Sequence, residues 1–466
     1  MARRALLTLA GLIAFGGVAV GAEVQTVAQP RDPALHAAHA RLDAVLIDRA
    51  HSGGGISTVI IQTREGGAVE PGIAACQGTP GVRFATLSAQ VAQVPDSCLE
   101  RLALDPAVSS ISVDRGITGS LQRTTRAAVG ATWVTEHLGF DGAGVGVAII
   151  DSGVAAWHEE LGANRVVHFA DFVARQTQPY DDYGHGTHVA GIIAGNGQNS
   201  GGSRRGIAPG AHLIVLKALD GAGDGNVSQV IAAVDYAVRN RNTFNIRIIN
   251  LSVAAPVYES YNTDPLTQAV RRAVEAGIVV ITAAGNLGRD PAGATQYGGI
   301  TAPGNAPWAL TIGASDDKGT PDGSDDTVAP FSSRGPALID GSTKPDLVAP
   351  GVGIESLGDA GSLLYQARPS ARRWGTVRTA SEPYLTLSGT SMAAPIVAGT
   401  VALMLQANPS LTPENVKAIL QRTAASNSRY DQLTQGAGFL NARAAVEMAR
   451  SLAAESPAPE EEAPVK

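Results

Sequence analysis

The sequence predicts an α/β fold: a doubly wound, mostly parallel sheet with helices on both faces. From Gly144 onward, short apolar runs alternate with helical stretches. Such alternation is typical of parallel strands that are buried on both faces of a sheet. The runs expected as strands are VGVAIID, HLIVLKAL, RIINLS and IVVITAAG, and the helices are expected near HVAGIIAG, VSQVIAAVDYAV, PLTQAVRRAVEA and APIVAGTVALMLQ.

A smaller α+β domain is predicted before this core, at residues 23–120. It contains three strand-like runs, ISTVIIQT (Ile56–Thr63), RFATLSAQVAQV (Arg83–Val94) and SSISVD (Ser109–Asp114). A helix candidate, DSCLERLAL, lies between the last two runs. Strand-like and helical segments of this length suit an independent domain.

The two ends of the chain differ from both domains in composition. Arg3 and Arg4 precede the apolar ALLTLAGLIAFGGVAVG, which predicts a signal peptide over residues 1–22, cleaved after about Ala22. An uncleaved membrane anchor is the alternative, but the segment is short for a bilayer span and rich in glycine. The Arg-Arg pair leaves open whether export is by the Sec or the twin-arginine route. Residues 451–466, ending in ESPAPEEEAPVK, are expected to be a disordered acidic and proline-rich tail.

Composition narrows the class of protein. The 466 residues leave room for two or three domains. A net charge of −7 without long basic runs argues against a nucleic-acid partner. The two cysteines, Cys76 and Cys98, fit neither a zinc site nor a disulfide scaffold, although export would permit a bridge between them. We expect a secreted monomer with no stable membrane anchor.

Three polar residues fall where this topology places chemistry, beyond the C-terminal ends of the strands. Asp151 ends the first run, Asn286 follows the fourth, and Ser391 in LSGTSMAAP begins a helix after the last extended segment. Ser391 could simply cap that helix. A serine at a helix N-terminus also lies near positive backbone dipoles, which would stabilise an oxyanion beside it. The choice depends on whether the chain supplies a base and an orienting acid.

The base candidate is His185 in YGHGTHVAGIIAG, because a glycine on each side lets backbone or substrate approach closely. His188 is expected to be a structural helix histidine, and no Glu follows the pair in the HExxH pattern of a metal site. The acid candidate is Asp151, since a carboxylate after four apolar residues is costly to bury without a partner. Its alternative role is to cap the following turn. Asn286 is either a turn residue or a donor to a developing oxyanion.

Three motifs then indicate a family. DSGV, HGTHVAG and GTSMAAP, in this chain order, resemble the signature motifs of the subtilisin-like serine proteases, the subtilases. The order acid, histidine, serine is itself a mark of that family. The resemblance covers about Thr125–Ala449, within an expected peptidase domain at residues 121–450. It implies a serine endopeptidase that acts on proteins or peptides. The resemblance also implies a role for each site residue. Asp151 would orient the base, His185 would be the general base and acid, and Ser391 would be the nucleophile. Asn286 would form the oxyanion hole with the Ser391 backbone N–H.

The resemblance also implies binding roles outside the triad. The N-terminal domain is similar to an inhibitory propeptide, so that the chain would be a self-processing zymogen inhibited by its own segment. In the family, a GxG segment pairs with the substrate as an edge strand, and two further segments line the pocket for the residue before the scissile bond. These segments are here Gly223, Asp224 and Gly225, then Ser252, Val253 and Ala254, and then Ala283, Ala284 and Gly285.

Other parts of the sequence are less informative. Calcium is common among subtilases, but the loop Asn196–Gly202 has no carboxylate, so no metal or other cofactor is assigned and a structural calcium stays open. The segment Glu355–Thr386 is expected to be a charged surface loop. Two other functions are disfavoured. A catalytically inactive subtilase-like binding module would have lost a motif residue, and an esterase would show G-x-S-x-G with the order serine, acid, histidine.

Overall fold

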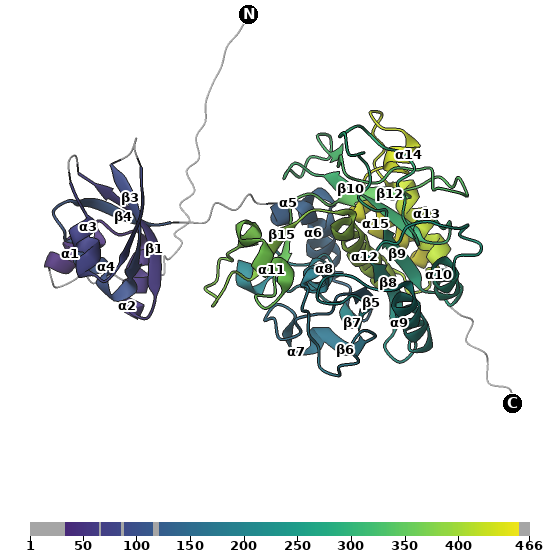
Figure 1. Ribbon diagram of the computed structural model, residues 1–466, viewed down its shortest axis with the longest axis horizontal. Coiled ribbons are helices and arrows are strands. Elements are labelled where there is room, and N and C mark those ends of the chain that lie inside the picture. Colours follow the sequence, from purple (N-terminus) through teal and green to yellow (C-terminus); the bar gives the residue numbers. More distant parts are fainter. Residues whose placement is uncertain (1–32, 65–66, 85–87, 115–120, 456–466) are drawn as a thin grey trace, which may run out of the picture. The chain divides into compact units, whose positions relative to one another are not determined.

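The computed structural model describes residues 33–64, 67–84, 88–114 and 121–455 (Figure 1). Contacts within the chain divide it into two compact units, Met1–Gly116 and Ile117–Lys466. The predicted signal peptide lies outside the described residues, as does all of the predicted tail after Glu455. The last helix runs to Glu455 and so includes residues 451–455, the first part of the predicted tail, which means that the boundary at residue 451 was placed too early.

The N-terminal unit is an α+β domain built on an antiparallel sheet with the strand order β2-β3-β1-β4. Burial alternates along β1, where Val59 and Ile61 are fully buried, so one face of the sheet carries the core of this unit. Leu46 and Leu99 from two helices pack into the same core. The elements are α1 (Pro33–His39), α2 (Ala44–Ser52), β1 (Ile56–Thr63), α3 (Glu70–Ala75), β2 (Thr79–Arg83), β3 (Ala89–Pro95), η1 (Asp96–Cys98), α4 (Leu99–Ala103) and β4 (Val108–Val113).

Two features of this unit differ from the sequence predictions. The run Arg83–Val94 is not one strand: β2 ends at Arg83 and β3 starts at Ala89, and the two strands pair with each other. Helices α1, α2 and α3 were not predicted. The structure also contains a disulfide bond between Cys76, which follows α3, and Cys98 at the end of η1.

The C-terminal unit has the predicted doubly wound architecture. Its sheet has the strand order β11-β10-β9-β8-β5-β7-β6, with β12 paired to β10. All of these pairings are parallel except that of β10 with β11. The strands of this sheet are β5 (Gly146–Asp151), β6 (Val166–Asp171), β7 (His212–Lys217), β8 (Ile246–Leu251), β9 (Val279–Ala283), β10 (Leu310–Asp316), β11 (Thr327–Val328) and β12 (Leu347–Pro350). The unit also contains β13 (Ile354–Leu357), β14 (Arg372–Arg373) and β15 (Tyr384–Leu387), which form a second sheet.

Helices cover both faces of this sheet, as the side chains of β5 illustrate. Val147 and Ile149 pack in a core with α8 and α12, whereas their neighbours Ala148 and Ile150 pack with α9 and α10. Because successive side chains of a strand point to opposite faces, the two cores lie on opposite sides of the sheet. The helices are α5 (Leu121–Ala128), α6 (Ala131–Trp133), η2 (Val134–Leu138), α7 (Gly162–Arg165), α8 (His185–Ala194), η3 (Gln198–Ser200), α9 (Val227–Arg239), α10 (Pro265–Glu275), α11 (Leu363–Ala367), η4 (Pro369–Ala371), α12 (Thr390–Ala407), α13 (Pro413–Thr423), α14 (Gln432–Gln435) and α15 (Ala442–Glu455).

The strand order reverses direction beside β5. From β5 the chain continues to β6 and β7 on one side, and then crosses to β8, β9 and β10 on the other side. In open parallel sheets, binding sites form at such a switch point, outside the carboxyl ends of the strands. Asp151 is the last residue of β5 and Ser252 directly follows β8, so both lie at this point.

The segment Glu355–Thr386 is only in part the surface loop that we expected: residues 366–382 are exposed or half-buried, but the two ends of the segment are packed. It contains β14, α11 and most of β13 and β15, which form a separate antiparallel sheet in the order β13-β15-β14. Glu355 is buried, and its carboxylate pairs with the buried Arg204 and with Arg373. A buried charge is stable only when it is paired, as Glu355 is here. Tyr384, in the same segment, is fully buried, so these parts of the segment belong to the packed unit.

One helix in the described part of the chain, α12, is long and apolar enough to span a membrane, but 83% of its apolar window is buried inside the unit. Its residues are buried nearly all round, as expected for the central helix of a large core. Ser391 lies in the first turn of this helix.

Candidate active site

Asp151 and His185 form a hydrogen-bonded pair at the switch point of the sheet. His185 Nδ1 lies 2.8 Å from Asp151 Oδ1 and 3.0 Å from Oδ2. The carboxylate is fully buried and also accepts a 2.7 Å hydrogen bond from the backbone N–H of Ser152. A carboxylate facing Nδ1 fixes the tautomer with the proton on Nδ1 and leaves Nε2 as the basic nitrogen.

The protein around Gly184 and Gly186, the glycines on either side of His185, leaves no room for a side chain at either position. A Cβ on Gly186 would lie 2.2 Å from the carbonyl oxygen of Gly153, and a Cβ on Gly184 would lie 2.3 Å from the hydroxyl of Ser362. Gly184 also has φ +101°, a backbone conformation that side chains disfavour. The predicted close approach is therefore present, and it brings the start of α8 against the loop that follows β5.

Asp181 holds this loop and helix together, and the sequence analysis did not single it out. Its buried carboxylate accepts hydrogen bonds from the backbone N–H groups of Gly184 and Thr187 at 2.7 and 2.8 Å, so it caps α8 from outside the helix. It also accepts a hydrogen bond from the hydroxyl of Ser152, which in turn accepts from the Gly186 N–H. Ser152, which follows Asp151, and Gly186, which follows His185, are thus joined through the Ser152 hydroxyl.

The electrostatic surroundings of the two histidines are opposite. Burial disfavours the charged form of His185, but the charge and hydrogen bond of Asp151, with a contribution from Asp181, raise its pKa above the ordinary 6.5. For His188, burial and the charge of His185 lower the pKa to about 3. The His188 ring is fully buried, and its Nε2 lies 2.9 Å from the carbonyl oxygen of Leu385. His188 therefore stays neutral and has the contacts of a structural residue.

Ser391 is held against Ser252 by two reciprocal hydrogen bonds. The hydroxyl of Ser391 donates to the carbonyl oxygen of Ser252 at 3.2 Å, and the hydroxyl of Ser252 donates to the carbonyl oxygen of Ser391 at 3.0 Å. Asn250 Nδ2 donates to the Ser252 hydroxyl at 2.9 Å and orients it. Within the described residues the Ser391 hydroxyl has no hydrogen bond to His185.

Pro395 explains why the Ser391 carbonyl accepts a side-chain donor. In an α-helix this carbonyl would accept from the N–H four residues later, but Pro395 has no N–H. The hydroxyl of Ser252 donates a hydrogen bond to the Ser391 carbonyl in place of the missing N–H. The proline in GTSMAAP and the serine after β8 therefore act together to place Ser391, a relation that the sequence analysis did not identify.

Asn286 is fixed by the residue before Ser391. Its Oδ1 accepts hydrogen bonds from the backbone N–H of Thr390 at 3.0 Å and from the Thr390 hydroxyl at 3.1 Å. Because a backbone N–H can only donate, the atom that faces it must be the amide oxygen. The Nδ2 group therefore points away, is exposed with the rest of the side chain, and makes no hydrogen bond within the described part of the chain.

A cleft of about 290 Å³ adjoins this centre. His185 and Ser252 both line it, together with the predicted substrate-binding residues Gly223, Asp224, Gly225, Val253 and Ala254. Apolar side chains, among them Leu219, Val230 and Leu266, form part of its walls. Of the third predicted segment, Ala283 and Ala284 are buried at the end of β9 and do not line this cleft, and Gly285 donates its N–H to the Thr390 hydroxyl.

The family-profile match and the sequence relatives identify one family. A sequence profile of the subtilase family matches residues 142–439. Serine protease AprX of Bacillus subtilis (strain 168) is 38% identical over 370 residues, which cover 78% of this chain and 80% of AprX. Subtilisin E of Bacillus subtilis (strain 168) is 32% identical over 369 residues, 78% of this chain and 82% of that protein. A crystal structure of a cold-adapted subtilisin-like serine proteinase matches at 31% identity with a TM-score of 0.49, over 65% of this chain and 90% of the other.

The Asp151–His185 pair predicts a titration that NMR can measure. Because Asp151 raises the pKa of His185, its imidazolium should persist above pH 6.5, and Asp151→Asn should lower that pKa by removing the charge. Among the facing groups, His188 has a pKa of about 3 and stays neutral in this range, so it should not mask the change. If His185 in the unmodified chain titrates at or below pH 6.5, the geometry of the pair is wrong.

Proposed function

Because this chain belongs to the subtilase family of serine endopeptidases, we propose that Asp151, His185 and Ser391 are its catalytic triad, with Asn286 in the oxyanion hole. The observation that carries this proposal is the hydrogen bond between His185 Nδ1 and the buried Asp151 carboxylate, which leaves Nε2 basic. Ser391 supplies the nucleophile from the first turn of α12. Substrates are proteins or peptides.

In acylation, the Ser391 hydroxyl turns from the Ser252 carbonyl toward Nε2 of His185 and attacks the carbonyl carbon of the scissile peptide bond. His185 takes the proton from Oγ as the new C–O bond forms. Asp151 stabilises the imidazolium and does not itself become protonated. His185 then gives the proton to the leaving amine as the C–N bond breaks, which leaves an acyl group on Ser391.

Two donors converge on the oxyanion of the tetrahedral intermediate. Asn286 supplies Nδ2, because its oxygen is occupied by Thr390. The backbone N–H of Ser391 supplies the second donor, since the first N–H groups of a helix have no acceptor within the helix. Donors that are fixed before the reaction stabilise the developing charge without reorganisation.

Deacylation repeats these steps with water as the nucleophile. His185 removes a proton from water, which attacks the ester carbonyl, and then returns a proton to Ser391.

Both half-reactions need neutral His185. Because its pKa is raised, kcat/KM should increase as the pH rises through that elevated pKa.

We extend the proposal to the N-terminal unit as an inhibitory propeptide that the enzyme removes itself. Its compact α+β fold supports an independent folding role. We expect the cut before Thr125. Two contacts within the C-terminal unit support this expectation: Thr125 donates a hydrogen bond to Asp317, and the buried Arg126 donates one to the Gly206 carbonyl. A disulfide between Cys76 and Cys98 supports export from the cytoplasm through the predicted signal peptide.

Substitution of the triad tests the catalytic proposal. Ser391→Ala and His185→Ala should each lower kcat by about a million-fold, as in subtilisin, a member of this family, and the double variant should be hardly worse because the residues act as a unit. Ser388→Ala, three residues earlier and exposed, is the matched control and should keep its activity. Full peptide hydrolysis by Ser391→Ala would refute the assignment.

Two substitutions separate the donor role of Asn286 from its structural role. Asn286→Asp keeps an oxygen for the Thr390 N–H but removes the amide donor, whereas Asn286→Ala removes both. Both should lower kcat by about 10²- to 10³-fold with KM nearly unchanged, the range measured for one such donor in subtilisin. Only the alanine variant should also lose thermal stability. An aspartate variant with normal kcat would leave Asn286 with a turn role alone.

Self-processing is tested by N-terminal sequencing. Wild type should yield a mature form that starts between Leu121 and Thr125, and Ser391→Ala should accumulate as a precursor cleaved only at the signal peptide. The N-terminal unit, added separately, should inhibit the mature form. The host must lack other extracytoplasmic proteases. If Ser391→Ala matures like wild type there, another protease performs the cut.

A further inference from the structure

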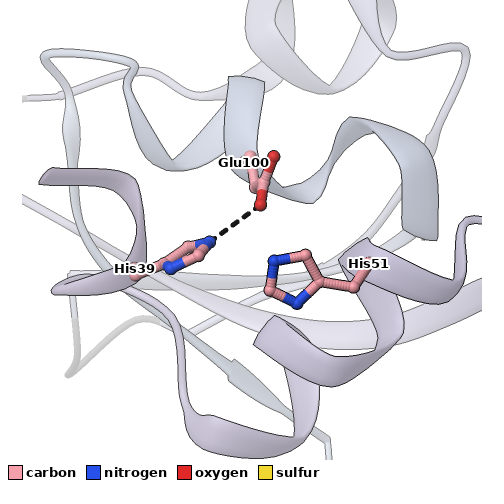
Figure 2. Close-up of side chains that lie close together, drawn as sticks. All are labelled: His39, His51 and Glu100. Carbon is pink, nitrogen blue, oxygen red and sulfur yellow. Dashed lines mark hydrogen bonds and ion pairs between the residues drawn. The ribbon is translucent and has the colours of Figure 1, made fainter. Parts of the chain in front are cut away.

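The N-terminal unit contains a cluster of metal-ligating side chains that neither the proposed mechanism nor any sequence motif uses. Within the described residues, His39, His51 and Glu100 form the one group of three or more such residues whose ligand atoms all lie within 4.8 Å of one another. They converge from α1, α2 and α4 (Figure 2). We propose that they bind a divalent transition-metal ion, with Zn²⁺ as the preferred ion.

The distances fit one small ion. Zinc binds imidazole nitrogen and carboxylate oxygen at about 2.0–2.2 Å, so two ligands of one tetrahedral ion lie roughly 3.3 Å apart. His39 Nε2 and Glu100 Oε1 are already 2.8 Å apart, joined by a hydrogen bond. The rings of His39 and His51 have centroids 5.3 Å apart and stand nearly perpendicular, so they can approach one ion from different directions. Small side-chain rotations bring all three atoms to bonding distance.

The third ligand, His51, has no competing partner. Its exposed ring makes no hydrogen bond within the described residues, and the one ring contact found for it there is the perpendicular one with His39. Glu100 is one-third exposed, so water can reach the fourth position of the ion. When the ion binds, His39 Nε2 gives up the proton of its hydrogen bond to Glu100, and that proton can move to Nδ1 of the same ring.

The fold holds the ligands in place through their sequence neighbours. His39 follows Ala38, and Glu100 follows Leu99; both neighbours are fully buried in the core of this unit. The disulfide at Cys98 fixes the chain two residues before Glu100. An ion bound here would join three helices that the sequence separates, and a small domain gains much of its stability from such links.

The chemistry of the ligand set selects the class of ion. Two imidazoles and one carboxylate suit zinc and its neighbours among the transition metals. Calcium and magnesium prefer oxygen ligands only. The three ligands form no sequence motif, because they lie on three separate helices and come together only in the folded domain.

The test measures zinc binding to the intact chain, kept unprocessed by Ser391→Ala and checked by mass spectrometry. Competition with a chromophoric chelator should detect one zinc ion per chain that is lost in His51→Ala, with affinity reduced by more than about tenfold. Glu100→Gln, which keeps an acceptor for His39, should also weaken binding. His36→Ala, an exposed histidine of α1 outside the cluster, is the matched control and should bind zinc normally. Calcium should not compete.

A second readout reports the link between helices. Zinc should raise the melting temperature of the N-terminal unit in the parent chain and in His36→Ala, and EDTA should reverse the rise. In His51→Ala the rise should be absent, while circular dichroism shows the same fold because the ring makes no hydrogen bond. The proposal is overturned if the parent chain binds no zinc at this unit, or if His51→Ala binds zinc with unchanged affinity.

Discussion

The start of helix α8 packs directly on the loop that follows β5, and the geometry of the Asp–His pair depends on that contact. Gly186 and the carbonyl of Gly153 lie so close that no side chain fits between them. The contact brings the end of the central strand and the first residue of the helix within hydrogen-bonding distance. Asp181 and the hydroxyl of Ser152 then fix both segments with charge-assisted hydrogen bonds, so Asp151 and His185 need no further movement to pair.

Ser391, the proposed nucleophile, is placed by a second and independent set of contacts. Helix α12 is buried on nearly every side, so the position of its first turn is set by the core. Pro395 leaves the Ser391 carbonyl without its helical donor, and Ser252 at the end of β8 supplies one. Thr390, one residue earlier, holds the oxygen of Asn286 and turns the amide donor outward. Residues that follow β8 and β9 therefore both contact the first turn of α12, where Ser391 lies.

Local sequence patterns predicted the parts of the structure that local forces determine. The runs that became β5, β7, β8 and β9, and the order of the three motifs, were visible because uncharged strands and glycine-flanked helix starts leave clear patterns. The segment Glu355–Thr386 was predicted only in part. Its packed ends were missed because its strands are short and its buried Glu355 pairs with Arg204, which is 151 positions away. Asp181 was missed for a similar reason: its neighbour Asp182 looks equivalent in sequence, but pairs with Lys217 instead.

The proposed mechanism requires that Ser391, activated by His185, attacks the peptide carbonyl. The most direct measurement is reaction with a serine-directed peptidyl phosphonate, followed by mass spectrometry and a crystal structure of the adduct. We expect one label per chain on Ser391 Oγ and loss of peptidase activity in step with labelling. The phosphonyl oxygen should lie within hydrogen-bonding distance of Asn286 Nδ2, and labelling should be much slower in His185→Ala. Label on another residue, with Ser391 unmodified in the inactivated enzyme, would contradict it.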